Sequence, residues 1–377
     1  MRLQKKTNQT CLENNKNSLM KIAIFGAGQL AMMMIQSDKE KKHEFIVIDP
    51  SDNPPASNYA QHIQSEYNNK NTLAEVSKQC DIATIDFENV CVESMRKIEK
   101  YIPVRPCPDA LEICQDRLKE KNLFKDLNIK TTTFSEVNSL DDLTKQVKQN
   151  KSYILKSRRF GYDGKNQYRI KPNTEIVTDL ISQECILEEV VNFDAEVSLI
   201  CVKSVDESVM YFPLIENTHE NGILSVSRFP SNYTHLQSDA EVIGAKLLES
   251  MKYVGVLVIE FFVKADQLLA NEMAPRVHNS GHWTIEGSSL SQFLAHINAI
   301  TGEPFESNIN FKNSVMFNIL SKFPGNDKIN KIKKDLNIHV HDYHKTEREN
   351  RKLGHITHIC DDKNKMDLNI KKILEIF

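Results

Sequence analysis

The sequence predicts a mixed fold, α/β in its N-terminal part and α+β in the remainder, and three observations support this prediction. A strand, a glycine turn, a helix and a second strand follow one another over residues 21–49. Short strands bounded by turns dominate residues 153–202, and a hairpin pattern covers residues 255–273. Alternating strands and helices favour a parallel sheet, whereas successive strands favour an antiparallel one. With 377 residues, the chain is long enough for two or three such domains.

The composition excludes several classes of protein. The 48 basic and 51 acidic side chains leave a net charge of −3, so we expect neither nucleic acid nor a membrane surface as a partner. The longest apolar stretch, residues 254–263, contains Glu260 and is too short to cross a bilayer. The 8 cysteines form no C-x-x-C pair, which favours reduced thiols and a cytoplasmic location.

Glycine is scarce, and the first glycines stand where a ligand could bind. The chain has only 12 glycines, about half the usual share of roughly 7%. Gly26 and Gly28 follow the first strand, and Asp49 ends the second strand 21 positions beyond Gly28. With Ala31, this spacing is similar to the dinucleotide fingerprint, so a nicotinamide-dependent oxidoreductase is one hypothesis.

The remaining elements follow in chain order. The polar residues 1–19 lack an apolar run and are expected to form a flexible extension. A third apolar run of the first domain ends at Glu88, and the proline-rich residues 103–108 are typical of a linker. Beyond it we expect helices over 109–127, 239–251 and 291–301, strands over 153–156, 167–170, 185–191 and 196–202, and a smaller lysine-rich α/β unit in the last seventy residues.

The hairpin at residues 255–273 predicts a metal site. If residues 265–267 form its loop, Lys264 pairs with Leu268 and Glu260 lies directly opposite Glu272. Two carboxylates about 5 Å apart repel each other, and a divalent cation between them removes that penalty. Oxygen ligands at this spacing suit Mg²⁺ with the phosphates of a nucleotide, and Asn271 could add another oxygen. The alternative is a register slip by one residue that turns one glutamate to solvent.

Two further segments carry candidate functional residues. A strand delivers Lys156 to a turn that contains Gly161 and Gly164, and such a turn can bind phosphate, although a basic surface hairpin is the plainer interpretation. In the segment 271–283, an arginine can bind a small oxyanion and a histidine can move protons. Two other interpretations involve histidines: a zinc pair formed by His278 and His282, which Gly281 disfavours, and strand alternation of His339, His341 and His344.

Five motifs together resemble one enzyme family. They are G-x-G-Q-L at 26–30, D-R-L-x-x-K at 116–121, K-x-R-R-x-G-Y-D-G at 156–164, two glutamates at 188 and 196, and N-E-M-A-P-R-V-H-N-S-G-H-W-T at 271–284. This series resembles the N5-carboxyaminoimidazole ribonucleotide synthetases of the ATP-grasp superfamily. The resemblance covers about residues 20–360 and implies an ATP-grasp fold. Its parts would be a Rossmann-like pre-ATP-grasp domain (20–107), a lid region (108–188), a catalytic domain (189–305) and a C-terminal small domain (306–377).

The resemblance also implies a reaction. ATP phosphorylates bicarbonate to carboxyphosphate, which carboxylates the amine of 5-aminoimidazole ribonucleotide in purine biosynthesis and leaves ADP and phosphate. Because carboxyphosphate hydrolyses in water, the lid must exclude solvent. ATP, two Mg²⁺ ions and a homodimer are expected. The alternatives are an ATP-grasp ligase acting on glycinamide ribonucleotide and a catalytically silent protein that kept the fold.

The family's functional residues are assigned to this chain by motif. Nucleotide contacts fall on Arg117, Lys156, Gly161, Tyr162, Asp163, Gly164, Lys165, Asn166, Gln167, Glu188, Glu189, Val190, Val191, Glu196, His219, Asn271 and Glu272. The Mg²⁺ ligands fall on Glu260 and Glu272, and the residues that position bicarbonate are Arg276, His278 and Asn279. The aminoimidazole nucleotide is assigned to Gly28, Gln29, Leu30, Glu88, Tyr162, Asp163, Lys345, Arg348, Arg351 and Lys352.

The chain departs from the family pattern where the family has glycine. Ala31, Phe160 and Asn166 replace three such glycines, and Glu349-Asn350 replaces a Pro-Gly pair. Because each replacement adds a Cβ atom, we expect the first turn and the lid to be stiffer than in relatives.

Overall fold

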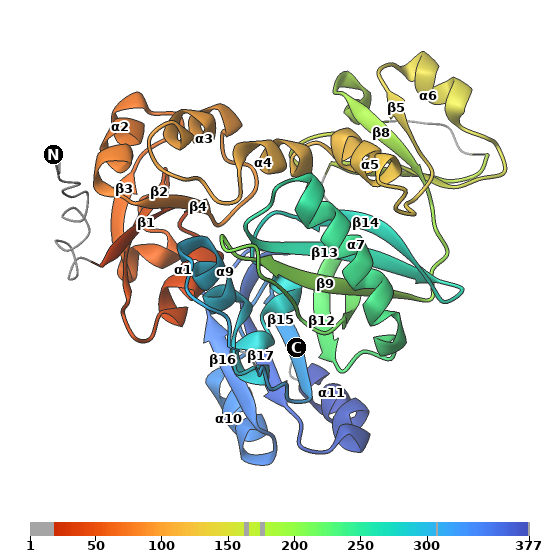
Figure 1. Cartoon of the computed structure of the whole chain (residues 1–377). Coiled ribbons are helices and arrows are strands. Elements are labelled where there is room, and N and C mark those ends of the chain that lie inside the picture. The colour runs from red at the N-terminus through yellow and green to blue at the C-terminus, as the bar shows by residue number, and fades with distance from the viewer. Residues whose placement is uncertain (1–18, 162–165, 174–177, 307, 376–377) are drawn as a thin grey trace, which may run out of the picture.

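A computed structural model describes residues 19–161, 166–173, 178–306 and 308–375. Within these ranges, three sheets form the framework. In Figure 1 they lie at the upper left, at the upper right and in the centre of the molecule. None of the described helices is both long enough and apolar enough to cross a membrane.

The N-terminal part has the predicted α/β architecture. Its four strands are parallel in the order β3-β2-β1-β4, and they are β1 (Met20–Phe25), β2 (His43–Asp49), β3 (Gln61–Gln64) and β4 (Ile82–Ile85). The connecting helices are α1 (Gln29–Ser37), η1 (Pro55–Asn58), α2 (Lys70–Gln79) and α3 (Val92–Glu99). The carboxyl ends of β1 and β4 therefore lie side by side, which is where parallel sheets bind ligands.

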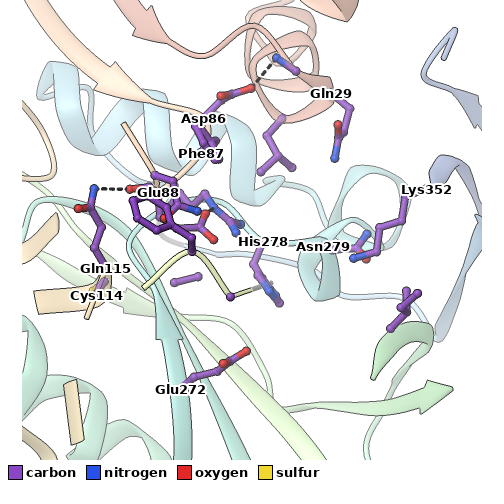
Figure 2. Close-up of a pocket in the computed structure, with 18 of the residues that line it drawn as sticks. Gln29, Asp86, Phe87, Glu88, Cys114, Gln115, Glu272, His278, Asn279 and Lys352 are labelled. Atoms are coloured by element: carbon purple, nitrogen blue, oxygen red, sulfur yellow. Dashed lines mark hydrogen bonds and ion pairs between the residues drawn. The ribbon is translucent and has the colours of Figure 1, made fainter. Parts of the chain in front are cut away.

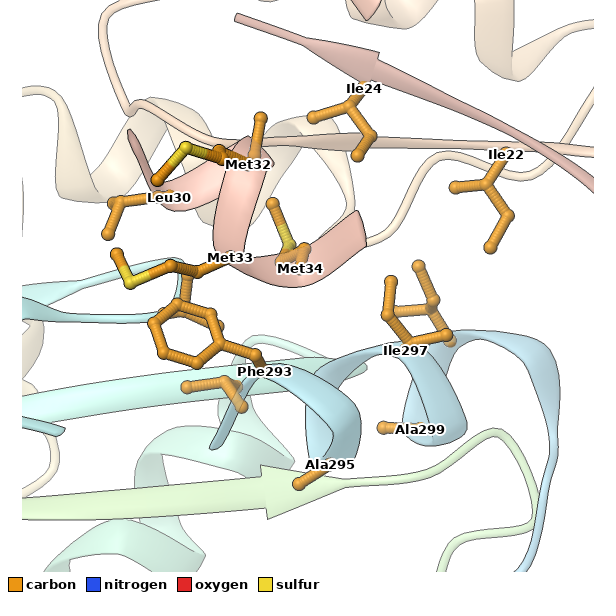
Figure 3. Packing of buried hydrophobic residues seen from close by; sticks show 14 of the residues in the cluster. Ile22, Ile24, Leu30, Met32, Met33, Met34, Phe293, Ala295, Ile297 and Ala299 are labelled. Carbon is orange, nitrogen blue, oxygen red and sulfur yellow. The ribbon is translucent and has the colours of Figure 1, made fainter. Parts of the chain in front are cut away.

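Helix α1 is buried because it joins two parts of the molecule. Its methionines pack against α9 (Gln292–Thr301), and in Figure 3 Met33 lies next to Phe293 of α9. A second link is polar, since the hydroxyl of Thr84 and Nε2 of His296 lie 2.9 Å apart. These contacts fix the glycine turn in front of α1 relative to the loop that precedes α9.

Two helices and a small antiparallel sheet follow. The expected helix over 109–127 is two helices, α4 (Pro108–Cys114) and α5 (Arg117–Asp126), because Asp116 is extended and its side chain caps α5 by accepting from the N–H of Leu118. The small sheet has the order β5-β8-β6-β7. Its elements are β5 (Phe134–Val137), α6 (Leu140–Gln146), β6 (Tyr153–Ser157), β7 (Gln167–Ile170), η2 (Asp179–Ser182) and β8 (Cys185–Glu189).

The largest sheet runs through the centre of the molecule without a break at residue 305. Among the described residues it has nine strands, in the order β14-β13-β9-β11-β12-β15-β17-β16 with β10 beside β9. Its strands are β9 (Ala195–Lys203), β10 (Val209–Tyr211), β11 (Ile215–Glu220), β12 (Ile223–Phe229), β13 (Gly255–Lys264), β14 (Gln267–Ala274), β15 (Ser314–Leu320), β16 (Ile338–Asp342) and β17 (Lys352–Ile359). Because β12 pairs with β15, the C-terminal residues extend the central sheet.

Helices and short turns cover this sheet. They are η3 (Thr234–Leu236), α7 (Gln237–Ser250), η4 (Asn279–Gly281), α8 (Thr284–Gly287), α10 (Asn326–Asp335), η5 (Lys363–Lys365) and α11 (Met366–Leu374). The expected helices at 239–251 and 291–301 correspond to α7 and α9. His339 and His341 alternate along β16 as predicted, whereas His344 lies beyond its end. The expected domain boundaries at 107, 188 and 305 stay predictions.

Candidate active site

A cavity of about 1170 Å³ lies between the N-terminal sheet, α5, the β13–β14 hairpin and the segment before β17. In Figure 2, Gln29 and Asp86 lie on one side of it, Glu272 on the opposite side, and His278 between them. The predicted site residues that line it are Gly28, Gln29, Leu30, Glu88, Arg117, Gly161, Glu260, Glu272, Arg276, His278, Asn279, Lys345, Arg348, Arg351 and Lys352. The tertiary structure thus brings together segments that lie far apart in the sequence.

The two predicted metal ligands lie opposite each other, although the predicted loop is wrong. The turn has two residues, Ala265 and Asp266, both with positive φ, so Lys264 pairs with Gln267. The register then shifts between Phe261 and Glu260, where one extra residue on β14 forms a β-bulge. The bulge restores the pairing of Glu260 with Glu272.

The electrostatic environments of the two carboxylates differ. Burial and the charge of Glu272 raise the pKa of Glu260 to about 7. Burial would also raise the pKa of Glu272, but the charge of Arg117 and its hydrogen bond at 2.7 Å hold that pKa at about 2. The positive charge of Arg117 therefore already compensates the negative charge of Glu272. A further cation would stabilise the charged form of Glu260.

The bulged residue, Asn271, contributes two features to the site. Its backbone carbonyl accepts from Nζ of Lys121 at 2.7 Å, and Lys121 is only 1% exposed. Its side-chain Oδ1 is buried and accepts from no group in the described part of the chain. A buried oxygen without a donor, on the residue that precedes Glu272 in the chain, fits a hard cation such as Mg²⁺.

Several predicted nucleotide contacts surround the same pair without lining the cavity. Lys156 on β6 forms an ion pair with Glu188 at 2.9 Å, and its charge lowers the pKa of Glu272. Nδ1 of His219 lies 2.7 Å from Glu196 on β9. Burial would lower the pKa of His219, but the hydrogen bond to Glu196 and the charge of Glu260 raise it.

The Glu188 side chain is enclosed. It is 3% exposed and lies between Lys156 and Lys121, at 2.9 and 3.3 Å. Burial would raise the pKa of Glu188, but the two lysines lower it well below its usual range. At Glu188, only the backbone is therefore available to a nucleotide, and the contacts predicted for residues 188–191 stay predictions.

The three residues assigned to bicarbonate lie together after β14. Arg276 forms an ion pair with Glu88, and the side-chain amide of Asn279 exchanges hydrogen bonds with that of Asn318. Nε2 of His278 lies 3.4 Å from Oε1 of Glu260. Burial and the charge of Arg276 lower the pKa of His278 well below its ordinary value.

His282 does not complete a zinc pair with His278. Its ring packs against His355 of β17, with the two ring centroids 4.9 Å apart. His282 is fully buried, so this ring belongs to the interface with the C-terminal strands and not to the cavity.

The glycine turn is already filled by carboxylates of the protein. Asp86, directly after β4, accepts from the N–H of Gly28 at 2.7 Å, and a Cβ atom on Gly26 would overlap that carboxylate. Asp49 accepts from the N–H of Ala27 at 3.1 Å and from the hydroxyl of Tyr67 at 3.0 Å. In a dinucleotide site the pyrophosphate would occupy the place of Asp86 and the ribose would take Asp49. The oxidoreductase hypothesis is therefore not supported.

The chain is similar to known proteins over most of its length. Three family models match: a ribonucleotide synthetase preATP-grasp domain over residues 19–115, an ATP-grasp domain over 122–293, and a phosphoribosylaminoimidazole carboxylase C-terminal domain over 314–368. N5-carboxyaminoimidazole ribonucleotide synthase of Pseudomonas aeruginosa is 36% identical over 358 residues, which is 94% of this chain and 98% of that protein. The chain belongs to the N5-carboxyaminoimidazole ribonucleotide synthase family.

Solved structures of this family have the same fold. N5-carboxyaminoimidazole ribonucleotide synthetase of Thermus thermophilus superposes with a TM-score of 0.87 at 36% identity, covering 94% of this chain and 98% of that one. The synthetase of Staphylococcus aureus complexed with ADP gives 0.86 at 32% identity, covering 93% and 96%. The resemblance and the ATP-grasp fold predicted from the motifs are thus confirmed.

Where this chain departs from the family pattern, three residues keep a glycine-like backbone. Phe160, Asn166 and Asn350 have φ values of 61°, 55° and 60°. The turns therefore keep a left-handed conformation at the cost of strain, which is greatest for the bulky Phe160. Ala31 is different, because it lies buried inside α1.

Some predicted residues fall outside the described part of the chain. They are Tyr162, Asp163, Gly164 and Lys165 of the lid turn, together with most of the N-terminal extension, residues 1–18.

Sequence reasoning missed several residues that shape this site. Asp86 and Glu120 line the cavity, and Lys121 and Gln292 support it from behind. Asp86 carried a usable signal, because it follows a parallel strand at the edge where ligands bind. Lys121 ends the D-R-L-x-x-K motif, but the motif gave it no role. Glu120 and Gln292 act through tertiary contacts.

Proposed function

We propose that this chain carboxylates 5-aminoimidazole ribonucleotide with bicarbonate and ATP, forming N5-carboxyaminoimidazole ribonucleotide, ADP and phosphate. The observation that carries the proposal is the cavity that joins the carboxylate pair Glu260–Glu272, the loop with His278 and the basic segment from Lys345 to Lys352. A nucleoside triphosphate, a small oxyanion and a sugar phosphate each need one of these three surfaces. Membership of the synthase family supports the same reaction.

The carboxylate pair would hold Mg²⁺ on the phosphates of ATP. Mg²⁺ supplies positive charge that balances those phosphates. Glu260 and Glu272 provide carboxylate oxygens, and the unpaired Oδ1 of Asn271 lies on the residue next to Glu272. The presence of two ions stays a prediction.

The loop after β14 would bind bicarbonate and its phosphorylated product. Arg276, paired with Glu88, brings positive charge to this loop, and His278 brings a ring nitrogen to 3.4 Å from Glu260. Because Glu88 binds Arg276, the guanidinium is oriented before the anion arrives, which favours stabilisation of charge that develops during phosphoryl transfer.

The basic segment before β17 would receive the phosphate of the ribonucleotide. Lys345 donates to Oε1 of Gln29 at 2.5 Å, so the segment is attached to the glycine turn. Because Asp86 and Asp49 already occupy the amides of Gly28 and Ala27, we assign the phosphate to the lysines and arginines and not to those two amides.

A direct assay tests the proposal. The pure protein is incubated with ATP, Mg²⁺, bicarbonate and 5-aminoimidazole ribonucleotide, and ADP release is followed. We expect ADP release that depends on both bicarbonate and the ribonucleotide. Equal release with glycinamide ribonucleotide in its place would favour the other ligase, and no release above the rate without a ribonucleotide would contradict the proposal. The homodimer and the cytoplasmic location stay predictions, and sedimentation of the purified protein tests the first.

A further inference from the structure

The ring of His278 is held at Nδ1 by a neighbour two residues along the loop. Oγ of Ser280 lies 2.9 Å from Nδ1, and the backbone N–H of Ser280 donates to the same nitrogen at 3.3 Å. A backbone N–H can only donate, so Nδ1 must be an acceptor. In a neutral imidazole whose Nδ1 accepts, the proton is on Nε2.

Ser280 is in turn held by a chain of buried hydrogen bonds that crosses the central sheet. The hydroxyl of Ser198 on β9 donates to Oγ of Ser280 at 2.9 Å, and Nδ2 of Asn217 on β11 donates to Oγ of Ser198 at 2.8 Å. The chain ends at Ser227 on β12, whose hydroxyl donates to Oδ1 of Asn217 at 2.8 Å. Because Ser198 donates its hydroxyl proton to Ser280, the hydroxyl proton of Ser280 is directed to His278.

Because its members are buried, this series of hydrogen bonds is rigid. Ser198, Ser227 and Ser280 are 0% exposed, and Asn217 is 6% exposed. A buried hydroxyl or amide that loses its partner costs about 1–3 kcal/mol. Each member therefore holds the next one in a single orientation.

A second contact fixes the backbone of His278. Gln292, the first residue of α9, accepts from the N–H of His278 at 3.0 Å and donates to its carbonyl at 2.6 Å. A Cβ atom on Gly281 would overlap the Gln292 side chain, which explains why glycine stands there. The backbone and the ring of His278 are thus held independently.

We propose that Ser280, supported by Ser198 and Asn217, is a positioning residue that fixes His278 with its proton on Nε2, directed into the cavity. In this form the ring donates a hydrogen bond to an oxygen of bicarbonate or carboxyphosphate and takes no proton at Nε2. Nε2 faces Glu260 at 3.4 Å, on the side where the reacting anion would lie. The inference rests on the proposed function and adds the role of His278 within it.

Nitrogen NMR of the wild-type protein tests the tautomer without any assay. The protein is labelled with ¹⁵N-histidine, and the His278 signals are identified by their loss in His278→Gln. We expect the ¹⁵N chemical shift of Nδ1 to lie in the range of an unprotonated ring nitrogen, and that of Nε2 in the range of a protonated one. A proton on Nδ1 in the wild type would overturn the proposal.

Variants test the positioning role. Ser280→Ala should lower kcat for ribonucleotide-dependent ADP formation about tenfold and leave the KM for ATP within about twofold. The variant keeps only the longer contact from the backbone N–H at 3.3 Å, so the His278 Nδ1 signal should move part of the way towards the protonated range. Ser198→Ala should do the same more weakly. The matched control is Ser94→Ala, which removes a hydroxyl that is also 0% exposed but lies on α3. It should change neither kcat nor the Nδ1 signal.

The outcomes separate this inference from the proposed function. If Ser280→Ala leaves both the tautomer and kcat unchanged, the positioning role is wrong. If kcat falls while the tautomer stays the same, the role is structural only and the proposal is overturned. If the wild type forms no ADP, the proposed function fails, and the NMR shifts of the wild type and of Ser280→Ala still decide the hydrogen-bond chain.

Discussion

Nζ of Lys121 donates to the backbone carbonyl of Asn271 at 2.7 Å, across 150 positions of the sequence. This contact lies at the bulged residue of β14, and the bulge sets Glu260 opposite Glu272. The same ammonium group also contacts the hydroxyls of Thr131 and Thr132, each at 3.1 Å. A buried lysine thus supports the strand geometry on which the proposed metal site depends.

Lys121→Met should therefore destabilise the protein and weaken the metal site. The change leaves the Asn271 carbonyl without its donor and Glu188 with one lysine fewer, so we expect a loss of about 2–3 kcal/mol in the free energy of unfolding. Urea denaturation measures the loss, and the Mg²⁺ dependence of ADP release measures the effect on the site. The control is Lys125→Met, an exposed position of the same helix. If both variants unfold at the same urea concentration, the supporting role of Lys121 is refuted.

Glu272→Gln should remove a carboxylate ligand and also the partner of Arg117. We expect kcat for ADP formation to fall about a hundredfold at low Mg²⁺ and to recover in part at high Mg²⁺. Glu249→Gln, an exposed change on α7, controls for the loss of one negative charge. Near-normal turnover of Glu272→Gln at low Mg²⁺ would contradict the assignment of this residue as a ligand.

In the basic segment from Lys345 to Lys352, some residues should only bind the phosphate, and others should also act on the groups at the reaction site. Arg348 is exposed at the rim of the cavity, whereas the charge of Lys352 acts on both Glu260 and His278. Arg348→Ala should raise the KM for the ribonucleotide about tenfold with little change in kcat, because a phosphate contact far from the reacting amine contributes uniform binding. Lys352→Ala should raise this KM and also lower kcat.

Steady-state kinetics with each substrate varied in turn distinguish these two effects. Lys334→Ala, at the basic end of α10, is the matched control. A change confined to the KM for ATP in either variant would show that the basic segment does not bind the ribonucleotide.

Asp86 should make stability depend on pH. Burial raises the pKa of Asp86 to about 7, even though the N–H of Gly28 stabilises its charged form. The folded protein therefore binds this proton more tightly than the unfolded chain, whose aspartate pKa is about 3.9. The stabilisation is complete below that value and is lost as the pH rises towards 7.

Asp86→Asn cannot titrate and should flatten this dependence. We therefore compare the free energy of unfolding of the variant with that of the wild type at each pH. From pH 4 to pH 8, this difference should shift in favour of the variant by about 3 kcal/mol. Thermal melts over this range provide the measurement, with Asp141→Asn, an exposed change on α6, as the control. A constant difference between variant and wild type at all pH values would argue against a raised pKa.

The sequence predicted the parts of the site that are encoded locally. The order of the motifs identified the family, and the alternation around Glu260 and Glu272 identified the carboxylate pair. That pairing was right for an incomplete reason, because a shorter turn and a bulge at Asn271 replaced the expected three-residue loop. A bulge depends on contacts outside its own hairpin, and no pattern within residues 255–273 reveals one.

By itself, the sequence determined which chemical groups this protein has: a carboxylate pair, an arginine–histidine loop, a glycine turn and a basic segment. Only the tertiary structure decided how those groups are used. Asp86 reaches back 58 positions to occupy the amide of Gly28, and Ser198 reaches 82 positions to Ser280 beside His278. The physical reason is that hydrogen-bond partners and burial are set by residues distant in sequence. The tautomer of a histidine, the charge state of a carboxylate and the register of a strand all depend on them.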